Sequence, residues 1–286
     1  MEYIIDGIED FNTDHIFDCG QCFRWKRQED GSYIGPAMNR IAKIFCKDGR
    51  LIIDNCNKED FETVWRAYLD LDRDYSALKE KLSAEDDFMK AATDYGYGIR
   101  ILRQDFWETV VSFIISQNNN IPRIKGCIES VCERFGRPIG EYEGKEYFSI
   151  PSPEKMASLN DDDLAPCRLG YRAPYLVKAA QQFVDSGGPE AVKAELKKAE
   201  DPIKELQRFC GIGPKVAACI SLFGLGRLDS FPIDVWMRRV MNRLYGIDEK
   251  DIRSMKMYAE EHFGENGGIA QQYLFYYIRG LDKNML

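Results

Sequence analysis

Residues 1–56 show the hydrophobic pattern of a small β-sheet. Asp30-Gly31 and Asp48-Gly49 are dipeptides typical of hairpin turns, and they separate short segments with β-branched or aromatic side chains. The segments that we expect to form strands are residues 22–26, 32–34, 41–46 and 51–54. Because tight turns reverse the direction of the chain, this pattern predicts an antiparallel sheet.

From Lys58 onward the spacing of hydrophobic residues is that of amphipathic helices. The first helix has apolar positions three or four residues apart, namely Phe61, Val64, Trp65, Tyr68 and Leu69. Three capping patterns predict where later helices begin: Ser83 with Asp86, Ser152-Pro153 and Asp201-Pro202. Gly187-Gly188-Pro189 predicts a loop between helices.

These patterns predict an α+β protein with two contiguous domains. A small N-terminal antiparallel sheet domain with flanking helices is expected over residues 1–100, and a larger all-helical domain over 101–286. The chain has 286 residues, 44% of them hydrophobic, and is long enough to bury such cores. The sequence contains neither an internal repeat nor a low-complexity tract.

The sequence lacks the marks of a membrane or secreted protein. Its longest core-like run, 110–115, is interrupted by Ser112 and falls short of the roughly 18 residues that a membrane span needs. The N-terminus, MEYIIDGIED, is acidic and unlike a signal peptide. Nine cysteines are scattered without a disulfide-scaffold pattern, which favours free thiols in a reducing compartment. We therefore expect a cytoplasmic protein.

Net charge by itself argues against a nucleic-acid partner, because the chain carries −8 at pH 7. The local distribution is different, however, since residues 201–245 contain seven basic and four acidic side chains. Local fields decide where a polyanion docks. Chance clustering of solvated charges explains this excess equally well, so charge leaves the question open.

A glycine-containing turn between two helices lies within residues 206–240. A short helix is expected to end near Phe209, Gly211-Ile212-Gly213 forms the turn, and Pro214 begins a helix that runs to about Phe223. Bare backbone amides and the positive end of the second helix suit a phosphate. Many helix–helix turns contain the same glycines without any ligand, so this motif needs support from its neighbours.

Two of those neighbours could carry chemistry. Lys215 falls in the first turn of the second helix, where the helix dipole and burial both favour a neutral amine that can attack an electrophilic carbon. Asp234 is expected to cap the next helix, and its carboxylate could stabilise positive charge on a sugar. The ordinary alternatives are an exposed lysine near a helix end and a plain N-cap.

The stretches GIGPKVAACI and FPIDVWM resemble the helix-hairpin-helix DNA glycosylases, and within that superfamily the 8-oxoguanine DNA glycosylases. The resemblance implies that Lys215 attacks the anomeric carbon, expels the base and forms a Schiff base, after which β-elimination nicks the strand. Asp234 would be the essential carboxylate. Relatives with an iron–sulfur cluster carry four cysteines after this motif, whereas this chain has none after Cys219. We expect no cofactor.

The same resemblance assigns a pocket for a base flipped out of the duplex. Cys219, one helical turn after Lys215, would pack on the base; Gln271 would bind its edge and Phe275 would stack on it. Within CGQCFRW, Gly20 matches a glycine whose carbonyl accepts the hydrogen that 8-oxoguanine, unlike guanine, carries on N7. Without the resemblance these residues would be interpreted as helix core, a surface amide and a turn.

Other matching positions concern the opposite strand and the DNA backbone. Asn118, Tyr171, Arg123 and Arg172 match residues that fill the gap left by the flipped base and read the orphaned cytosine. Gly211 and Gly213 would approach a phosphate. Trp236 stands where animal members have a histidine near a DNA phosphate, which leaves that contact open. The short N-terminal sheet and the absence of a basic import signal favour a bacterial or archaeal source.

Competing interpretations make different demands on the sequence. Glycosylases for alkylated bases typically lack the lysine that is present here as Lys215, and a non-catalytic helix-hairpin-helix DNA-binding protein needs neither Lys215 nor Asp234. An unrelated helical protein would show no salt-sensitive DNA binding. The pair Cys19 and Cys22 has no second matching pair, and His15 is not enough to complete a zinc site. We therefore expect no metal, double-stranded DNA containing 8-oxoguanine as the partner, and a monomer.

Overall fold

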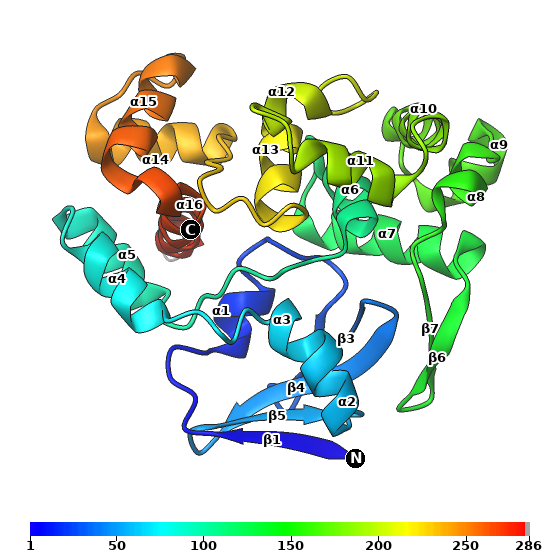
Figure 1. Ribbon diagram of the computed structural model, residues 1–286, viewed down its shortest axis with the longest axis horizontal. Coiled ribbons are helices and arrows are strands. Elements are labelled where there is room, and N and C mark those ends of the chain that lie inside the picture. The colour runs from blue at the N-terminus through cyan, green and yellow to red at the C-terminus, as the bar shows by residue number, and fades with distance from the viewer. Residues whose placement is uncertain (284–286) are drawn as a thin grey trace. The chain divides into compact units, whose positions relative to one another are not determined.

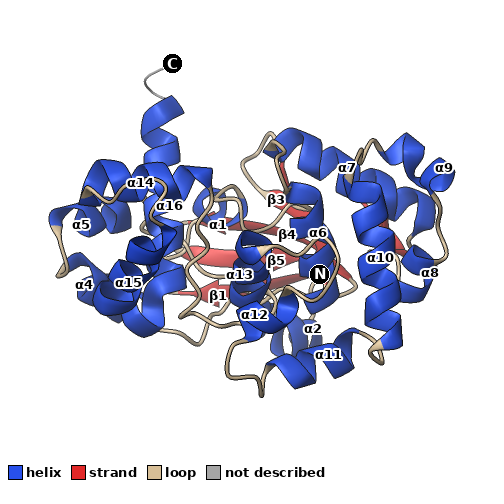
Figure 2. Cartoon of the chain, turned by 90° about the horizontal axis from the view of Figure 1, so that it is seen from above, coloured by secondary structure: helices blue, strands red, loops and turns tan. Residues whose placement is uncertain are grey.

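The strands among the described residues form one antiparallel sheet and one separate hairpin. The computed structural model describes residues 1–283, with side chains as far as 281. The sheet has the order β1-β5-β4-β3-β2 (Figures 1 and 2). Its strands are β1 Glu2–Asp6, β2 Lys26–Arg27, β3 Tyr33–Ala37, β4 Arg40–Lys47 and β5 Arg50–Asp54. The predicted α+β class and the N-terminal antiparallel sheet are confirmed.

Details of this sheet differ from the pattern in the sequence. The turn between β4 and β5 is as predicted, because Asp48 and Gly49 both have positive φ, 52° and 72°, which is hairpin geometry. Residues 22–26 were wrongly predicted as a strand, since only Lys26 belongs to one. Strand β1 was missed; it pairs with β5 through Ile4 and Ile52, a partner 48 residues away that local sequence does not reveal.

Two compact units divide the chain, and each is assembled from separate segments. The first unit comprises residues 1–21, 44–103 and the chain from 226 onward; the second comprises 22–43 and 104–225. This division differs from the contiguous domains 1–100 and 101–286 because tertiary contacts, rather than chain order, define it. The contiguous domain boundary stays a prediction.

The first unit contains most of its helices in two stretches of chain. Residues 58–68 are continuously helical with a π-helical turn at Phe61–Trp65, so the helix predicted from Lys58 is confirmed. Helix α16 packs against α5 and α14. The helices are α1 Thr13–Phe17, α2 Lys58–Asp60, α3 Arg66–Tyr68, α4 Tyr75–Ser83, α5 Asp87–Tyr95, α14 Val235–Tyr245, α15 Ile252–Phe263 and α16 Gly267–Lys283, with a 3₁₀ turn at Gly264–Asn266.

The second unit contains eight α-helices among the described residues, of which α6 and α13 pack against each other. They are α6 Phe106–Ser116, α7 Ile121–Phe135, α8 Pro153–Ala157, α9 Asp161–Leu164, α10 Arg172–Asp185, α11 Pro189–Leu196, α12 Pro202–Leu206 and α13 Pro214–Phe223, with a 3₁₀ turn at Ala165–Cys167. Helix α13 has the bounds predicted from the sequence. Candidate membrane-spanning helices were sought among the described residues, and none is long and apolar enough.

The prediction of an all-helical second domain is wrong in one place. Strands β6 Pro138–Tyr142 and β7 Lys145–Phe148 form a hairpin within the predicted helical region. Tyr147 of this hairpin is buried in a small cluster with Ile34 and Ile41, which come from the preceding sheet. The strands were missed because their burial depends on this distant partner. Helix α1 was likewise missed, because it is a short helix within the region predicted to be strands.

Most of the predicted helix starts have the expected caps. Ser152 accepts from the Lys155 amide, and Asp201 accepts from the Lys204 amide, each with proline at the first helical turn. Ser83 was wrongly placed in the cap of α5. Asp86 caps that helix, whereas Ser83 is the last residue of α4.

Candidate active site

In the second unit, the turn between α12 and α13 contains the two glycines predicted to approach a phosphate. Gly211 has φ of 76°, and a Cβ there would lie 2.7 Å from the Cβ of Tyr175, so only glycine fits. Gly213 caps α13 in extended conformation, and a Cβ there would meet nothing within 4 Å. Space beside Gly213 therefore leaves the first amides of α13 accessible to an anion.

Lys215 follows this turn and is half-buried in the first turn of α13. Its Nζ lies 5.3 Å from the centre of the Phe113 ring, within the range of a cation–π contact. Cys219 is buried one helical turn further along. Phe113 comes from α6 and stacks on Phe223 with the ring centres 5.4 Å apart. Phe113 was not predicted as a site residue, because its sequence context is that of one more apolar residue in a core helix.

The junction between α6 and α7 carries the predicted wedge. Asn118 has φ of 45°, an uncommon conformation for a residue other than glycine. The Gln117 amide donates to the carbonyl of Gly211 at 2.9 Å, which fastens the junction to the glycine turn. Tyr171 is 50% exposed, and its hydroxyl donates to the carbonyl of Gln117 at 3.2 Å. The second unit therefore brings the two predicted wedge residues together.

The two arginines predicted to read the orphaned cytosine occupy different environments. Arg123 is exposed, donates to the carbonyl of Arg168 at 3.2 Å, and lines a shallow cavity of about 590 Å³ together with Tyr171. Arg172 is only 3% exposed, and its guanidinium donates to backbone carbonyls. Arg123 is accessible to a base in this structure, whereas Arg172 supports the protein chain.

In the first unit, Asp234 caps α14. Its Oδ1 accepts from the Met237 amide at 2.8 Å, as predicted, and the side chain is half-buried. Trp236 lies in the first turn of the same helix, and the guanidinium of Arg239 sits 5.4 Å from its ring centre. Trp236 is uncharged, but the guanidinium of Arg239 places a positive charge beside it that could attract a phosphate. The hydrogen bond to the Met237 amide accounts for Asp234 as a helix cap and gives no information on a catalytic role.

The same unit brings three predicted base-pocket residues together. Gly20 has φ of 89°, and a Cβ there would lie 3.3 Å from the Phe275 ring. Gln271 is one helical turn before Phe275 on α16. Gln271 is only 6% exposed, yet its amide has no hydrogen-bond partner within residues 1–283. The Gln271 amide is not among the fully buried polar atoms that lack a partner, so it is open to a polar ligand without being a strained, desolvated group.

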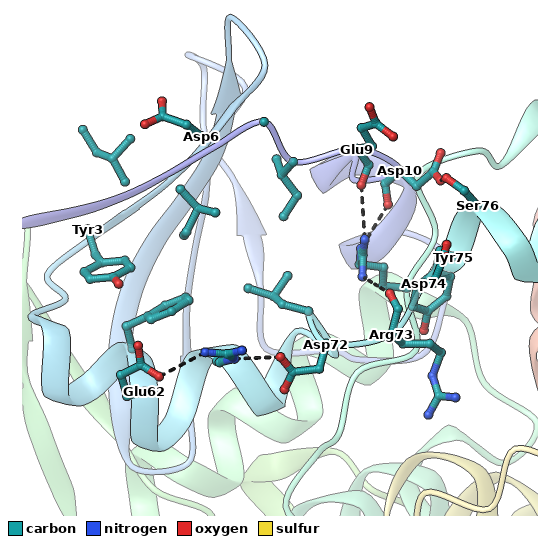
Figure 3. A pocket seen from close by; sticks show the side chains of 18 residues that line it. Tyr3, Asp6, Glu9, Asp10, Glu62, Asp72, Arg73, Asp74, Tyr75 and Ser76 are labelled. Carbon is teal, nitrogen blue, oxygen red and sulfur yellow. Dashed lines mark hydrogen bonds and ion pairs between the residues drawn. The ribbon is translucent and has the colours of Figure 1, made fainter.

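The first unit also has a cavity of about 630 Å³, and none of the predicted site residues lines it (Figure 3). Its charged groups are largely paired with each other. Arg66 donates to Glu62 and Asp72 at 3.3 and 2.7 Å, and Arg100 donates to the carbonyls of Glu9 and Asp10 at 3.2 and 3.0 Å. We therefore assign this cavity no chemistry.

Within the described part of the chain, no group of three or more His, Cys, Asp or Glu side chains is arranged to hold a metal ion. Cys19 and Cys22 are both buried and reduced. Burial raises the pKa of Cys19 to about 11, and its Sγ donates to the carbonyl of Ile16 at 3.2 Å.

Comparison with known proteins places this geometry in a family. The model of the 8-oxoguanine DNA glycosylase N-terminal domain matches residues 4–110, and that of the HhH-GPD superfamily base excision DNA repair proteins matches residues 111–265. An N-glycosylase/DNA lyase from Saccharomyces cerevisiae is 31% identical over 82% of this chain and 68% of its own length. A probable N-glycosylase/DNA lyase from Methanothermobacter thermautotrophicus is 29% identical over 78% of this chain and 75% of its own.

Solved structures give the same result. The Clostridium acetobutylicum 8-oxoguanine glycosylase/lyase, in complex with double-stranded DNA containing cytosine opposite 8-oxoguanine, has a TM-score of 0.92 and 40% identity. The match covers 98% of this chain and 96% of the other. The chain therefore belongs to the HhH-GPD superfamily of base excision DNA repair proteins, in the branch with the N-terminal domain of 8-oxoguanine DNA glycosylases.

Proposed function

We propose that this protein is a bifunctional DNA glycosylase that removes 8-oxoguanine opposite cytosine and then nicks the strand at the abasic site. One observation carries this proposal beyond family membership. The amide of Gln271, a residue that is only 6% exposed, has no hydrogen-bond partner within residues 1–283, and it lies one helical turn from Phe275, whose ring is beside Gly20. This arrangement suits the polar edge and flat face of a purine.

Lys215 is the proposed nucleophile. Its amine forms a bond to the anomeric carbon as the bond from that carbon to the base breaks, and the departing base takes up a proton. The bond from the anomeric carbon to the ring oxygen then breaks, and the ring oxygen takes up a proton as this adduct becomes a Schiff base. The Schiff base permits β-elimination, in which C2′ loses a proton and the bond between the sugar and its 3′-phosphate breaks. The Asp234 carboxylate would stabilise positive charge on the sugar. The place of Lys215 at the start of α13, next to accessible helix amides, supports attack on a sugar flanked by phosphates.

Recognition of the lesion rests on a difference at N7. The Gly20 carbonyl would accept the N7 hydrogen of 8-oxoguanine but would face a lone pair on guanine, which disfavours the undamaged base. Phe275 would stack on the flipped base, Gln271 would bind its Watson–Crick edge, and Cys219 would pack against it.

DNA contacts are proposed for residues of both units. Gly211 and Gly213 would approach a phosphate through their amides, and Trp236 with its neighbouring arginine would contact another. Asn118 and Tyr171 would fill the gap in the duplex. Arg123 would read the orphaned cytosine. A monomeric state and a bacterial or archaeal cytoplasmic location, expected from the sequence, stay proposals.

Borohydride trapping tests the function directly. A duplex with one 8-oxoguanine opposite cytosine is incubated with the wild-type protein, Lys215→Gln, and Lys197→Gln, which changes an exposed lysine beyond the end of α11 as a matched control. We expect a covalent band for the wild type and Lys197→Gln and none for Lys215→Gln. Excision without any trapped band would mean a glycosylase without lyase activity.

The alternative is a non-catalytic helix-hairpin-helix DNA-binding protein. The glycine turn by itself fits that function, because phosphate binding requires only the backbone amides. DNA binding without excision or trapping, unchanged in Lys215→Gln, would favour the alternative over the enzyme.

A further inference from the structure

The loop around Gly20 is fixed from one side by Gln21. This glutamine is completely buried, and its amide donates to the carbonyls of Ile16 and Arg100 at 2.9 and 2.8 Å. Its Oε1 accepts from the Leu102 amide at 2.9 Å. Both N–H donors and the oxygen of the amide therefore hold the residue after Gly20 in place.

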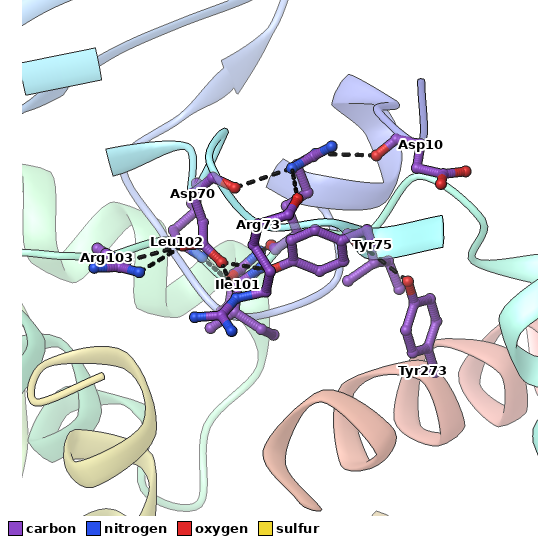
Figure 4. Close-up of polar contacts among 11 residues, drawn as sticks. Asp10, Asp70, Arg73, Tyr75, Ile101, Leu102, Arg103 and Tyr273 are labelled. Atoms are coloured by element: carbon purple, nitrogen blue, oxygen red, sulfur yellow. Dashed lines mark hydrogen bonds and ion pairs between the residues drawn. The ribbon is translucent and has the colours of Figure 1, made fainter. Parts of the chain in front are cut away.

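The segment that receives these bonds is itself held by a buried network (Figure 4). The Tyr75 hydroxyl accepts from the Ile101 amide at 2.8 Å and donates to the Asp70 carboxylate at 3.0 Å. Tyr273, on α16, donates to the carbonyl of Ile99 at 3.4 Å. The support of the loop is thus rigid and connected to the helix that carries the base-pocket residues.

Helix α16 fixes the loop from the other side. Gln272, 3% exposed, donates to the carbonyl of Cys19 at 2.7 Å. Arg279 donates from Nη2 to the carbonyl of Asp18. Side chains of α16 therefore donate hydrogen bonds to the carbonyls of Asp18 and Cys19, the two residues before Gly20. The Gly20 carbonyl receives no hydrogen bond within residues 1–283 and stays available to a ligand.

Arg279 contacts more of the pocket than one carbonyl. Its guanidinium carbon lies 5.5 Å from the centre of the Phe275 ring, and its Nη1 is 3.3 Å from the position that a Gly20 Cβ would take. Nη1 is buried without a hydrogen-bond partner in the described structure. An apolar side chain could fill the same space without the free-energy cost of a buried, unpaired N–H donor. Packing alone therefore does not explain why this position is an arginine.

We infer that Arg279 is a positioning residue for lesion recognition: it aims the Gly20 carbonyl and fixes the Phe275 ring against which the base stacks. A glycine peptide has wide conformational freedom, so its carbonyl needs restraint from neighbours. Arg279 supplies that restraint through the Asp18 carbonyl, two residues before Gly20, and through the adjacent Phe275 ring. The inference rests on the proposed function and adds a residue that never touches the reacting atoms.

The test separates base recognition from the chemistry of the sugar. Single-turnover excision is measured on a duplex with 8-oxoguanine opposite cytosine, and strand nicking on the same duplex with a preformed abasic site, which has no base to recognise. The variants are Arg279→Met, Arg279→Lys, and Arg253→Met, an exposed arginine of α15 that serves as the control.

We expect Arg279→Met to slow excision by about 10- to 100-fold, the cost of misplacing a reacting group by an ångström, while nicking changes less than about twofold. Arg279→Lys should recover part of the loss, since an amine can still donate to the Asp18 carbonyl. Unchanged excision in Arg279→Met overturns the inference. Arg279→Met and Arg279→Lys proteins that lose excision and nicking to the same extent also overturn it. A wild type inactive on both duplexes would instead refute the proposed function.

Discussion

The guanidinium of Arg172 donates from Nη2 to the backbone carbonyl of Asn118 at 2.7 Å. It also donates from Nε to the carbonyl of Gln117 at 2.8 Å and from Nη1 to that of Leu169 at 3.2 Å. Because Asn118 has the left-handed φ of 45°, this buried arginine stabilises a strained turn of the wedge. Arg172 therefore supports the loop in this structure.

Replacing Arg172 by methionine should release this turn. We expect excision of 8-oxoguanine to slow by about tenfold, to the same extent with cytosine or adenine opposite, because the wedge is weakened for every duplex. Single-turnover rates on the two duplexes check this. A selective loss opposite cytosine would instead mean that Arg172 reads that base.

Arg123→Ala provides the contrasting variant. This exposed arginine is free to reach an orphaned cytosine, and one good contact to a base is worth about 1–3 kcal/mol of discrimination. The preference for cytosine over adenine should therefore fall in Arg123→Ala, while the rate opposite adenine changes little. An unaltered preference would exclude Arg123 as the reader.

Gln271→Met should separate stability from activity. The native amide makes no hydrogen bond with the described residues and is not fully desolvated, so an apolar side chain of similar size should change the free energy of unfolding by less than about 0.5 kcal/mol. Excision should fall by about 10- to 100-fold, because the base edge loses its partner. Urea unfolding and single-turnover excision measure the two effects. A less stable Gln271→Met protein would show that the amide has a structural partner.

Two substitutions in the glycine turn should affect different properties, one the stability of the protein and the other its affinity for DNA. Gly211→Ala should destabilise the protein by about 2 kcal/mol, because φ is 76° and the new Cβ would lie 2.7 Å from Tyr175. Gly213→Ala should leave stability nearly unchanged, since its Cβ would meet nothing within 4 Å, but should weaken DNA binding by blocking the phosphate. Thermal unfolding and titration with duplex DNA distinguish the two; normal DNA affinity in Gly213→Ala would argue against a phosphate there.

Stability should depend on pH through Glu108, which lies 3.6 Å from the buried Arg24. Burial raises the pKa of Glu108 from 4.5 to about 7, although Arg24 opposes the shift. The native state then binds the proton more tightly than the unfolded chain. The protonated Glu108 therefore contributes its full stabilisation of the native state below pH 4.5 and loses it as the pH rises to about 7. This contribution to the free energy of unfolding is about 3 kcal/mol at most.

The measurement compares urea unfolding of the wild type and Glu108→Gln between pH 4.5 and 8. The advantage of Glu108→Gln over the wild type should grow across this range, because glutamine does not titrate. Glu133→Gln, an exposed change on α7, should follow the wild type. Parallel curves for the wild type and Glu108→Gln would show that the carboxyl is not held protonated.

Local signals in the sequence were enough for the elements that carry the chemistry. Pro214 set the start of α13 and thereby the place of Lys215, and Asp234 capped α14 as its sequence context predicted. Such features depend on residues within one helical turn of each other, so a linear pattern records them. The resemblance to known glycosylases likewise rests on short contiguous motifs.

Contacts between distant segments decided the rest. Strand β1 needed β5, and the hairpin β6–β7 needed a cluster with residues of the first sheet, so neither was recognisable alone. The resemblance assigned Arg172 to the orphaned cytosine, whereas folding buries it against the loop of Asn118. Arg279 lies beside the predicted lesion pocket only because α16 packs beside the Gly20 loop. Sequence by itself determined which groups could react and recognise the base. Tertiary structure decided which were exposed and how they were aimed, because burial and carbonyl orientation arise from partners far away in the chain.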